Sequence, residues 1–263
     1  MKLLTLNCHS WQEEKQIEKI KYLAKVIKEK QYDVVALQEI SQRIDSKLVS
    51  DKVKEDNYVY LLLKELEALG EKNYRFIWDY SHIGYDIYEE GSAILTNKNI
   101  VMEESFYVSN SISEKDYKSR KIVKARIKVD EIDYDIYTCH LGWWDDEKEP
   151  FKYQLDNLLK HLTNKTSFIM GDFNNDAFIR NQGYDYLIDK GLVDTYTLAN
   201  DKDSGVTVAG EIDGWKGSKN SKRLDLILTN KNENKIIYSK VIFNGENKEI
   251  VSDHYGVEIQ VRC

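Results

Sequence analysis

The sequence predicts a layered α+β protein in which two mostly antiparallel β-sheets pack face to face and helices flank them. Many short apolar runs of strand length alternate with only a few segments of helical period, a pattern typical of this fold class. The chain has 263 residues, of which 41% are hydrophobic and 32% charged, enough to bury a large core. No linker, repeat or low-complexity segment divides it, so we expect a single domain over residues 1–263.

The N-terminal half is expected to contain two helices among several strands. Apolar side chains recur with a helical period over residues 13–29, for example at Ile20, Leu23 and Ile27. A second helix is predicted over residues 52–69, because Gly70 is a typical terminator. The predicted strands are residues 2–7, 33–39, 76–80 and 92–96, and a polar, aromatic loop is expected over 81–91.

The C-terminal half is expected to be richer in strands. Residues 123–129 and 132–141 predict a hairpin that turns at Asp130 and Glu131. A helix is predicted over residues 152–162, and the single proline, Pro150, precedes it and marks no linker. The remaining predicted strands are residues 167–170, 224–228, 240–243 and 256–261.

Composition argues against several classes of protein. The chain carries 38 basic and 45 acidic side chains, a net charge of −7, whereas nucleic-acid binding draws most of its affinity from Lys and Arg. No apolar run approaches the roughly 18 residues that would span a membrane, and the first residues, MKLLTLNCHSW, are too short in their apolar part for a signal peptide. Cys8, Cys139 and Cys263 show no metal-binding spacing. We therefore expect a reduced, cytoplasmic protein.

Polar groups that bind metals or phosphates stand at the ends of several apolar segments. A lone Asp or Asn after a strand is usually a turn former, and a lone His is usually structural. Six such segments together instead predict a reaction centre, because rigid strands fix the groups that loops expose. The groups are Asn7, Glu39, His140, Asp172 with Asn174, Asp225, and Asp253 with His254. In GDFNNDAF, Asn175 and Asp176 are left to turn or capping roles.

The ordered motifs LNCHSW, LQEI, CHLGWW, GDFNND, RLDLIL and SDHYG resemble the endonuclease/exonuclease/phosphatase superfamily, over residues 4–257. This superfamily includes pancreatic-type deoxyribonuclease, apurinic endonucleases, neutral sphingomyelinases and inositol phosphatases. The resemblance implies a four-layered α/β sandwich, a divalent metal and hydrolysis of a phosphoester. Oxygen ligands of this kind suit Mg²⁺, with Mn²⁺ as a substitute.

The resemblance also implies roles for individual residues. Glu39 would be the principal metal ligand, assisted by Asn7, and Asp253 would lie near the metal and orient His254. Asp172 would align or deprotonate the attacking water. Such chemistry is mostly positioning and neutralisation of charge on phosphoryl oxygens.

Further residues would contact the phosphoryl group. The resemblance implies that Asn174 and His140 bind its oxygens, and that Asp225 holds His140 or a second ion. It also implies a basic ligand, for which Arg120 is the first candidate and Arg126 and Arg223 are alternatives.

The loops bear on the substrate. Aromatic groups can stack on sugars, bases or lipids, but the acidic segments near Glu89 and Asp145 disfavour a nucleic acid. No apolar hairpin or signal peptide points to a membrane. The loops are similar to those of the branch that hydrolyses maltose 6'-phosphate, so we expect a phosphomonoesterase acting on a small phosphorylated sugar. Alternatives are a phosphodiesterase (nuclease or sphingomyelinase-like) and an inactive binding module. The candidate substrate-binding residues are His82, Tyr85, Trp143, Trp144 and Trp215.

Overall fold

Two β-sheets form the centre of the computed structural model, which describes residues 1–233 and 235–262. The first sheet has seven strands in the spatial order β12 (Asp201–Lys202), β14 (Lys235–Ile242), β15 (Gly256–Arg262), β1 (Lys2–Asn7), β2 (Val34–Arg43), β6 (Tyr88–Thr96) and β5 (Arg75–Gly84). The second has six, in the order β11 (Val193–Asp194), β13 (Asp225–Thr229), β10 (Thr166–Asp172), β9 (Ile132–His140), β8 (Lys121–Val129) and β7 (Asn99–Tyr107).

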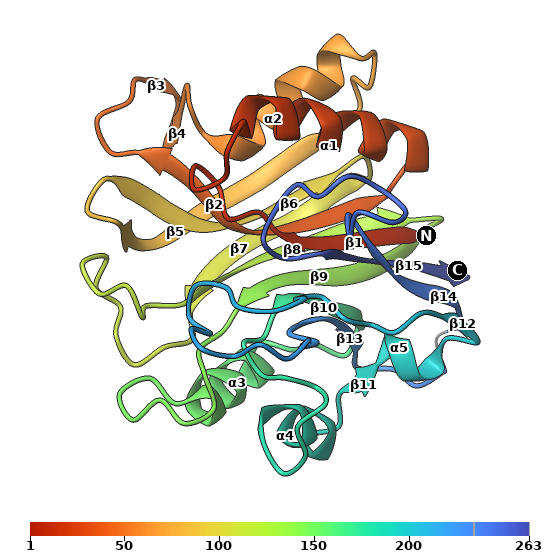
Figure 1. The fold of residues 1–263 in the computed structure, drawn as a ribbon. Coiled ribbons are helices and arrows are strands. Elements are labelled where there is room, and N and C mark those ends of the chain that lie inside the picture. Colours follow the sequence, from red (N-terminus) through yellow and green to blue (C-terminus); the bar gives the residue numbers. More distant parts are fainter. Residues whose placement is uncertain (234, 263) are drawn as a thin grey trace.

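Helices cover the outer face of each sheet, which gives the four layers of the predicted sandwich (Figure 1). On the first sheet lie α1 (Gln16–Lys30) and α2 (Tyr58–Ala68); on the second lie α3 (Phe151–Lys160) and α4 (Gly183–Asp189). A short helix, α5 (Thr195–Leu198), and a two-stranded ribbon of β3 (Leu48–Ser50) and β4 (Val53–Lys54) complete the described elements. Most strand pairs are antiparallel, as predicted; the parallel pairs are β1 with β2, β9 with β10 and β12 with β14.

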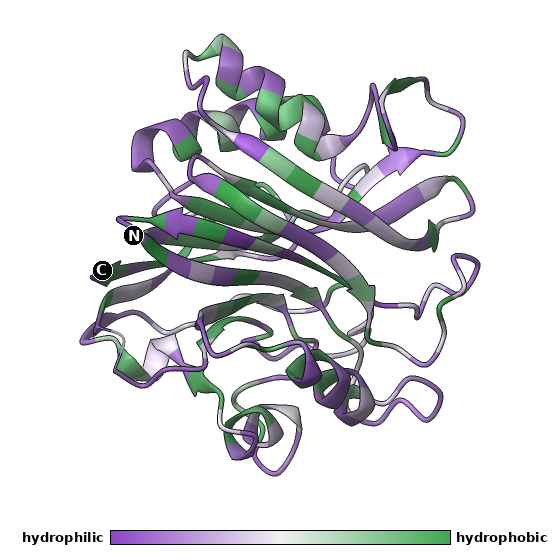
Figure 2. Ribbon diagram, turned by 180° about the vertical axis from the view of Figure 1, so that it is seen from behind, coloured by the Kyte–Doolittle hydropathy of each residue, from purple (hydrophilic) through white to green (hydrophobic). Residues whose placement is uncertain are grey.

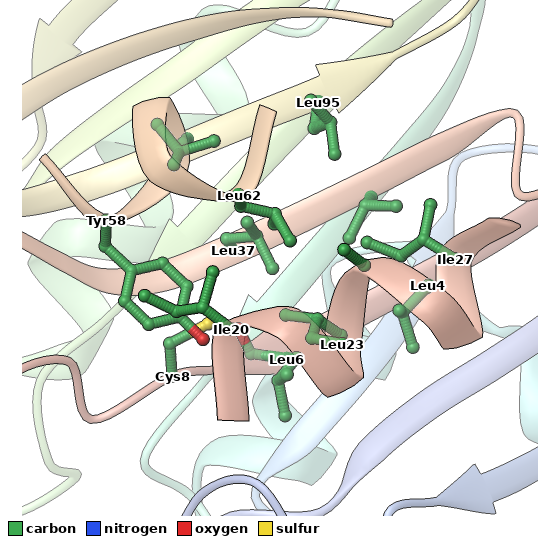
Figure 3. Packing of buried hydrophobic residues seen from close by; sticks show 14 of the residues in the cluster. Leu4, Leu6, Cys8, Ile20, Leu23, Ile27, Leu37, Tyr58, Leu62 and Leu95 are labelled. Carbon is green, nitrogen blue, oxygen red and sulfur yellow. Dashed lines mark hydrogen bonds between the residues drawn. The ribbon is translucent and has the colours of Figure 1, made fainter. Parts of the chain in front are cut away.

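The two-residue alternation of strand side chains separates three apolar layers. In β1, Leu3 faces the space between the sheets, whereas Leu4 and Leu6 face α1 and α2. Figure 3 shows this outer layer, in which Ile20 and Leu23 of α1 pack against strand side chains. The interior strands of the first sheet are covered on both faces, so their sequences are apolar almost throughout. The helices keep a polar outer face (Figure 2).

Several boundaries differ from the predicted ones. The second helix begins at Tyr58 instead of residue 52, because the Asn57 side chain caps it by accepting a hydrogen bond from the Tyr60 amide at 3.1 Å. The preceding Val53–Lys54 segment forms β4. The predicted loop over residues 81–91 is mostly hairpin: β5 and β6 continue through it and leave only a turn at 85–87.

Some elements were not predicted from the sequence. Strand β7, the short strands and helices α4 and α5 all lack a clear apolar period; β7 is an edge strand that carries many exposed polar side chains. The hairpin of β8 and β9 turns at Asp130 and Glu131, as predicted, and both residues have positive φ. Cys8 and Cys139 are buried and unpaired, and Cys263 lies outside the described residues. None of the described helices is long and apolar enough to span a membrane.

A glycine next to the predicted site is required by a close approach of two strands. Gly171 has a φ of +147°, and a Cβ built there would lie 1.9 Å from the Cys139 carbonyl oxygen. The parallel register pairs these two residues directly. No L side chain fits this position, so the glycine sets how closely β9 and β10 pack just before both strands end.

We expect Gly171→Ala to destabilise the protein by about 3 kcal/mol or more, because the strands must separate or the backbone must adopt a strained conformation. Thermal unfolding would show a fall in Tm of roughly 6–12 °C. The control is Gly210→Ala, where a Cβ meets nothing within 4 Å and φ lies outside the left-handed region. Equal Tm values for the two variants would contradict this account of Gly171.

Candidate active site

Three neighbouring strands of the second sheet bring His140, Asp172 and Asp225 side by side. Asp172 pairs with His140 in the parallel β9–β10 register and with Asp225 in the antiparallel β10–β13 register. The ends of β9 and β10 and the start of β13 therefore meet at one edge. The sequence separates these residues widely, but the strand register makes them adjacent.

The first sheet contributes Asn7 and Glu39 from its parallel strands β1 and β2. A bulge interrupts the β2–β6 register between Leu37 and Ile40, and Glu39 within it has a φ of +52°. Leu37 and Ile40 both pack in the outer apolar layer, so the bulge absorbs one extra residue and turns the Glu39 carboxylate to the site. Bulges commonly redirect a side chain in this way next to active sites.

The Asn7 amide joins the two sheets. Its Nδ2 donates to Glu39 Oε1 at 2.8 Å and to Asp172 Oδ2 at 3.2 Å, and its Oδ1 accepts from the His9 amide at 3.1 Å. Carboxylates accept and a backbone N–H donates, so the orientation of this amide is unambiguous. Asn7 thus directs its NH₂ group towards Glu39. The expected role of Asn7 as a metal ligand would instead require its side-chain oxygen there.

His254 pairs with Asp225, whose carboxylate oxygen Oδ2 lies 2.9 Å from Nδ1 of the imidazole. This partner differs from the expected ones, which were His140 for Asp225 and Asp253 for His254. Burial alone would lower the pKa of His254, but the carboxylates of Asp225 and Asp172 raise it well above its usual value. His254 is therefore a buried imidazolium that presents Nε2 at 3.8 Å from Asp172 Oδ2.

Asp172 and His140 have the opposite character. Burial raises the pKa of Asp172 to about 7, although His254 acts in the other direction. Burial and the positive charge of Arg120 hold the pKa of His140 well below its usual value, so its imidazole is neutral. The His140 Nε2 atom lies 3.8 Å from Asp172 Oδ2 and 3.9 Å from Glu39 Oε1. The site thus combines a carboxylate poised near neutral pH with one charged and one neutral imidazole.

The acidic groups form a setting that a divalent cation would stabilise. Desolvation, together with the Glu90 and Asp253 carboxylates, raises the pKa of Glu39 to about 8, although the Asn7 hydrogen bond and His9 act in the other direction. Asp172, Asp225 and His254 also place ligand atoms within 4.8 Å of one another, a spacing that can hold a metal ion. The carboxylate oxygens among these groups are hard donors that fit Mg²⁺ or Mn²⁺, whereas His254 would have to lose a proton to become a ligand. A second such group is His9, Glu13 and Asp253, of which His9 and Asp253 line the cavity described next.

A cavity of about 590 Å³ opens in front of these groups. Of the predicted site residues, those that line it are Glu39, His82, Tyr85, Arg120, His140, Trp143, Asp172, Asn174, Asp253 and His254. Asn7 and Asp225 lie behind the lining and hold it in place through the hydrogen bonds described above. Asn175 and Asp176 bond backbone groups, as expected for turn residues.

The three candidate arginines occupy different places. Arg120 lines the cavity, is buried, and has a buried Nε without a hydrogen-bond partner among the described residues. Arg126 instead pairs with Asp135 and Arg223 pairs with Asp194, each through two hydrogen bonds. Only Arg120 of the three is placed to bind an anion in this cavity.

Some of the predicted aromatic residues line the cavity and others do not. Trp143 and Tyr85 line the cavity, and the buried Nε1 of Trp143 has no partner among the described residues. Trp144 points away and packs against Phe151 and Tyr186 of the outer helices. The Trp215 ring also lies outside the lining, and its Nε1 donates to Asn174 Oδ1 at 3.1 Å. The sequence predicts that Trp144 and Trp215 contact the substrate, but neither ring lies where it could stack on a ligand in this cavity.

Sequence reasoning did not identify several lining residues. Glu90 is half-buried, with His82 3.3 Å away, and the positive charges of His82 and Arg120 keep the pKa of Glu90 below its usual value although desolvation raises it. Glu90 lies in the segment 81–91, which the sequence predicts to be a loop. Recognition of a strand pattern in this segment could have identified Glu90 as a residue that faces the cavity. The other lining residues not identified are His9, Ile83, Gly84, Asp86, Lys115, Tyr117, Asp213 and Gly214.

Comparisons with known proteins agree with this geometry. The family model described as "Endonuclease/Exonuclease/phosphatase family" matches residues 6–254. An endonuclease/exonuclease/phosphatase family protein from Leptotrichia buccalis is 41% identical with a TM-score of 0.94, and each chain covers 100% of the other. No curated protein matches the chain.

More distant solved structures share the fold. A mannosyl-6-phosphatase from Bacteroides thetaiotaomicron is 16% identical with a TM-score of 0.69, and both chains are covered completely. TDP2 from C. elegans is 14% identical with a TM-score of 0.66; the match covers all of this chain and 75% of that one.

We expect Asp225→Asn to lower the pKa of His254, because the amide removes the closest negative charge that stabilises the imidazolium. Titration of the histidine ring protons by NMR measures this change. The control is Asp45→Asn, which removes an exposed carboxylate paired with Arg43. A His254 titration that is the same in wild type and Asp225→Asn would show that Asp225 does not set its charge.

Proposed function

The chain belongs to the endonuclease/exonuclease/phosphatase family, a family of hydrolases of phosphoric esters, and from this premise we propose that it is a Mg²⁺-dependent phosphomonoesterase of a phosphorylated sugar. The observation that carries the proposal is the cavity of about 590 Å³, which has phosphoryl-binding groups inside and acidic, aromatic residues at its mouth. Asp86, Asp213 and Tyr85 stand there, and all three are exposed.

This mouth favours a small neutral leaving group. Carboxylates accept hydrogen bonds from sugar hydroxyls, and tyrosine or tryptophan rings stack on the apolar faces of sugars. Asp86 and Asp213 would instead repel the backbone of a nucleic acid, and the chain as a whole carries a net charge of −7. A cavity of this size is also in the range of small-molecule sites.

The side chains divide the work of hydrolysis. The His254 imidazolium, the neutral His140 and the Asn174 amide would donate to the phosphoryl oxygens, and Arg120 would add a positive charge. Asp172, with a pKa of about 7, would take the proton of the attacking water near neutral pH. The water oxygen then bonds to phosphorus, the bond from phosphorus to the sugar oxygen breaks, and that oxygen takes a proton from solvent at the cavity mouth.

Glu39 and Asp253 are the residues that would hold the Mg²⁺ ion. When bound, the ion would neutralise charge on the phosphoryl group and orient it. It would also favour the charged form of Glu39, whose pKa is raised by desolvation and by neighbouring carboxylates. Asn7 would keep Glu39 and Asp172 at a fixed separation through its NH₂ group.

Within the class of sugar phosphates, we propose maltose 6'-phosphate, on the resemblance of the loops. The mannosyl-6-phosphatase among proteins of this fold supports a sugar 6-phosphate as the kind of substrate. A cytoplasmic location belongs to the same proposal, because the described cysteines, Cys8 and Cys139, are buried and unpaired.

We expect purified protein to release phosphate from maltose 6'-phosphate with Mg²⁺ or Mn²⁺, and to lose this activity with a chelator. Glu39→Gln and His254→Ala should lower kcat by about 10²–10³-fold, since each removes a charge from the site. The control is Glu131→Gln, because that side chain is 90% exposed on a distant turn. Nicking of plasmid DNA or cleavage of sphingomyelin, without release of phosphate from any sugar phosphate, would replace this proposal by a phosphodiesterase.

We expect Arg120→Met to raise KM for the sugar phosphate by roughly 10–100-fold, the effect of losing a charge-assisted hydrogen bond of about 1.5–3 kcal/mol. Steady-state kinetics measure it. The control is Arg180→Met, which removes a guanidinium that is 68% exposed and pairs with Asp185 outside the cavity. An unchanged KM in Arg120→Met would exclude Arg120 as the basic phosphate ligand.

A further inference from the structure

Asn174 is held by two partners that fix the orientation of its amide. Its Nδ2 donates to the Leu141 carbonyl oxygen at 2.9 Å, and its Oδ1 accepts from Trp215 Nε1 at 3.1 Å. A carbonyl oxygen only accepts and an indole N–H only donates, so neither partner tolerates a flipped amide. Asn174 lines the cavity, and its second Nδ2 hydrogen remains for a ligand there.

Trp215 reaches Asn174 from a loop, residues 209–221, that is closed by a bridge between Val208 and Lys222. The buried Lys222 ammonium organises this loop from inside: it donates to the carbonyl oxygens of Gly210 at 2.7 Å, Asn220 at 3.0 Å and Ser218 at 3.4 Å. It also lies 5.6 Å from the centre of the Trp215 ring. The loop therefore has a built interior, and the indole is not a freely moving surface group.

The backbone of Asn174 links the contact with Trp215 to Asp172. Asn174 has a φ of +49°, and its backbone N–H donates to Asp172 Oδ1 at 2.8 Å. Asp172 and Asn174 are thus coupled through the backbone turn, while Trp215 secures the far end of the Asn174 side chain. Without the indole N–H, the Asn174 oxygen would lose its donor, and only the Leu141 carbonyl oxygen would still hold the amide, so the direction of its free N–H would be less well fixed.

We propose that Trp215 is a positioning residue: its indole N–H, together with the Leu141 carbonyl oxygen, holds the Asn174 amide so that its NH₂ group faces the phosphoryl group of the substrate. The proposal rests on the proposed phosphatase function and replaces the expectation that Trp215 stacks on the sugar. Trp215 acts through a hydrogen bond to Asn174 and does not touch the substrate.

Kinetics with substitutions at both positions test the role. Trp215→Phe keeps a ring and removes the N–H, and it should lower kcat about tenfold while KM for the sugar phosphate changes less than about twofold. In an Asn174→Ala background the same substitution should have almost no further effect, because the group it positions is gone. The control Trp144→Phe, which alters an indole packed on the outer helices, should leave kcat unchanged.

Two results would overturn the proposal. One is a kcat unchanged by Trp215→Phe. The other is a loss in the double variant equal to the product of the single losses, which would show that Trp215 acts independently of Asn174. If the unchanged kcat came with a large rise in KM, the data would favour direct stacking of Trp215 on the sugar.

A measurement without turnover separates this inference from the proposed function. The ¹H–¹⁵N NMR spectrum contains one indole signal for each of five tryptophans, and Trp215→Phe identifies that of Trp215. Asn174→Asp, which offers a stronger acceptor, should move this indole proton downfield, and Asn174→Ala should move it upfield. Protein inactive on all phosphate esters would refute the proposed function; an indole signal unmoved by both variants would refute the positioning role.

Discussion

The site depends on one set of hydrogen bonds that spans the two sheets. Asn7 at the end of β1 donates to Glu39 of β2 and to Asp172 of β10, so the two sheets meet there at a fixed separation. The pair of Asp225, from β13, and His254, from the loop before β15, spans the same gap. The apolar cluster between the sheets fills the space there, whereas these polar contacts also specify which atoms face each other.

Holding this many charges together is costly for the protein and useful for its chemistry. Glu39, which is half-buried, and Asp172, which is buried, have raised pKa values of about 8 and 7, because desolvation disfavours their charged forms. His254 offsets part of that cost at Asp172, and a bound cation would offset it at Glu39. Groups of one chemical type thus differ in pKa because their surroundings differ, and such differences are what acid–base and metal-binding roles require.

Much of the architecture could be predicted from local pattern, and the exceptions have local causes. The apolar runs of β1, β2, β9 and β10 are strong signals because both faces of these strands are buried. The start of α2 was misplaced because its cap, Asn57, outweighs the helical pattern that extends further upstream. The hairpin of β5 and β6 was read as a loop because His82 and Glu90, polar residues in strands, face the cavity instead of solvent or core.

The sequence by itself determined the family, the layered fold and the set of polar groups at strand ends, because periodicity and short motifs are local properties of the chain. Only the tertiary structure decided the partners within that set. It paired Asp225 with His254 and not His140, placed Arg120 but neither Arg126 nor Arg223 in the cavity lining, and left Trp144 and Trp215 outside that lining. The physical reason is that a pattern shows which face of a strand a side chain occupies, whereas its partner is set by strand register and sheet packing between segments far apart in the chain.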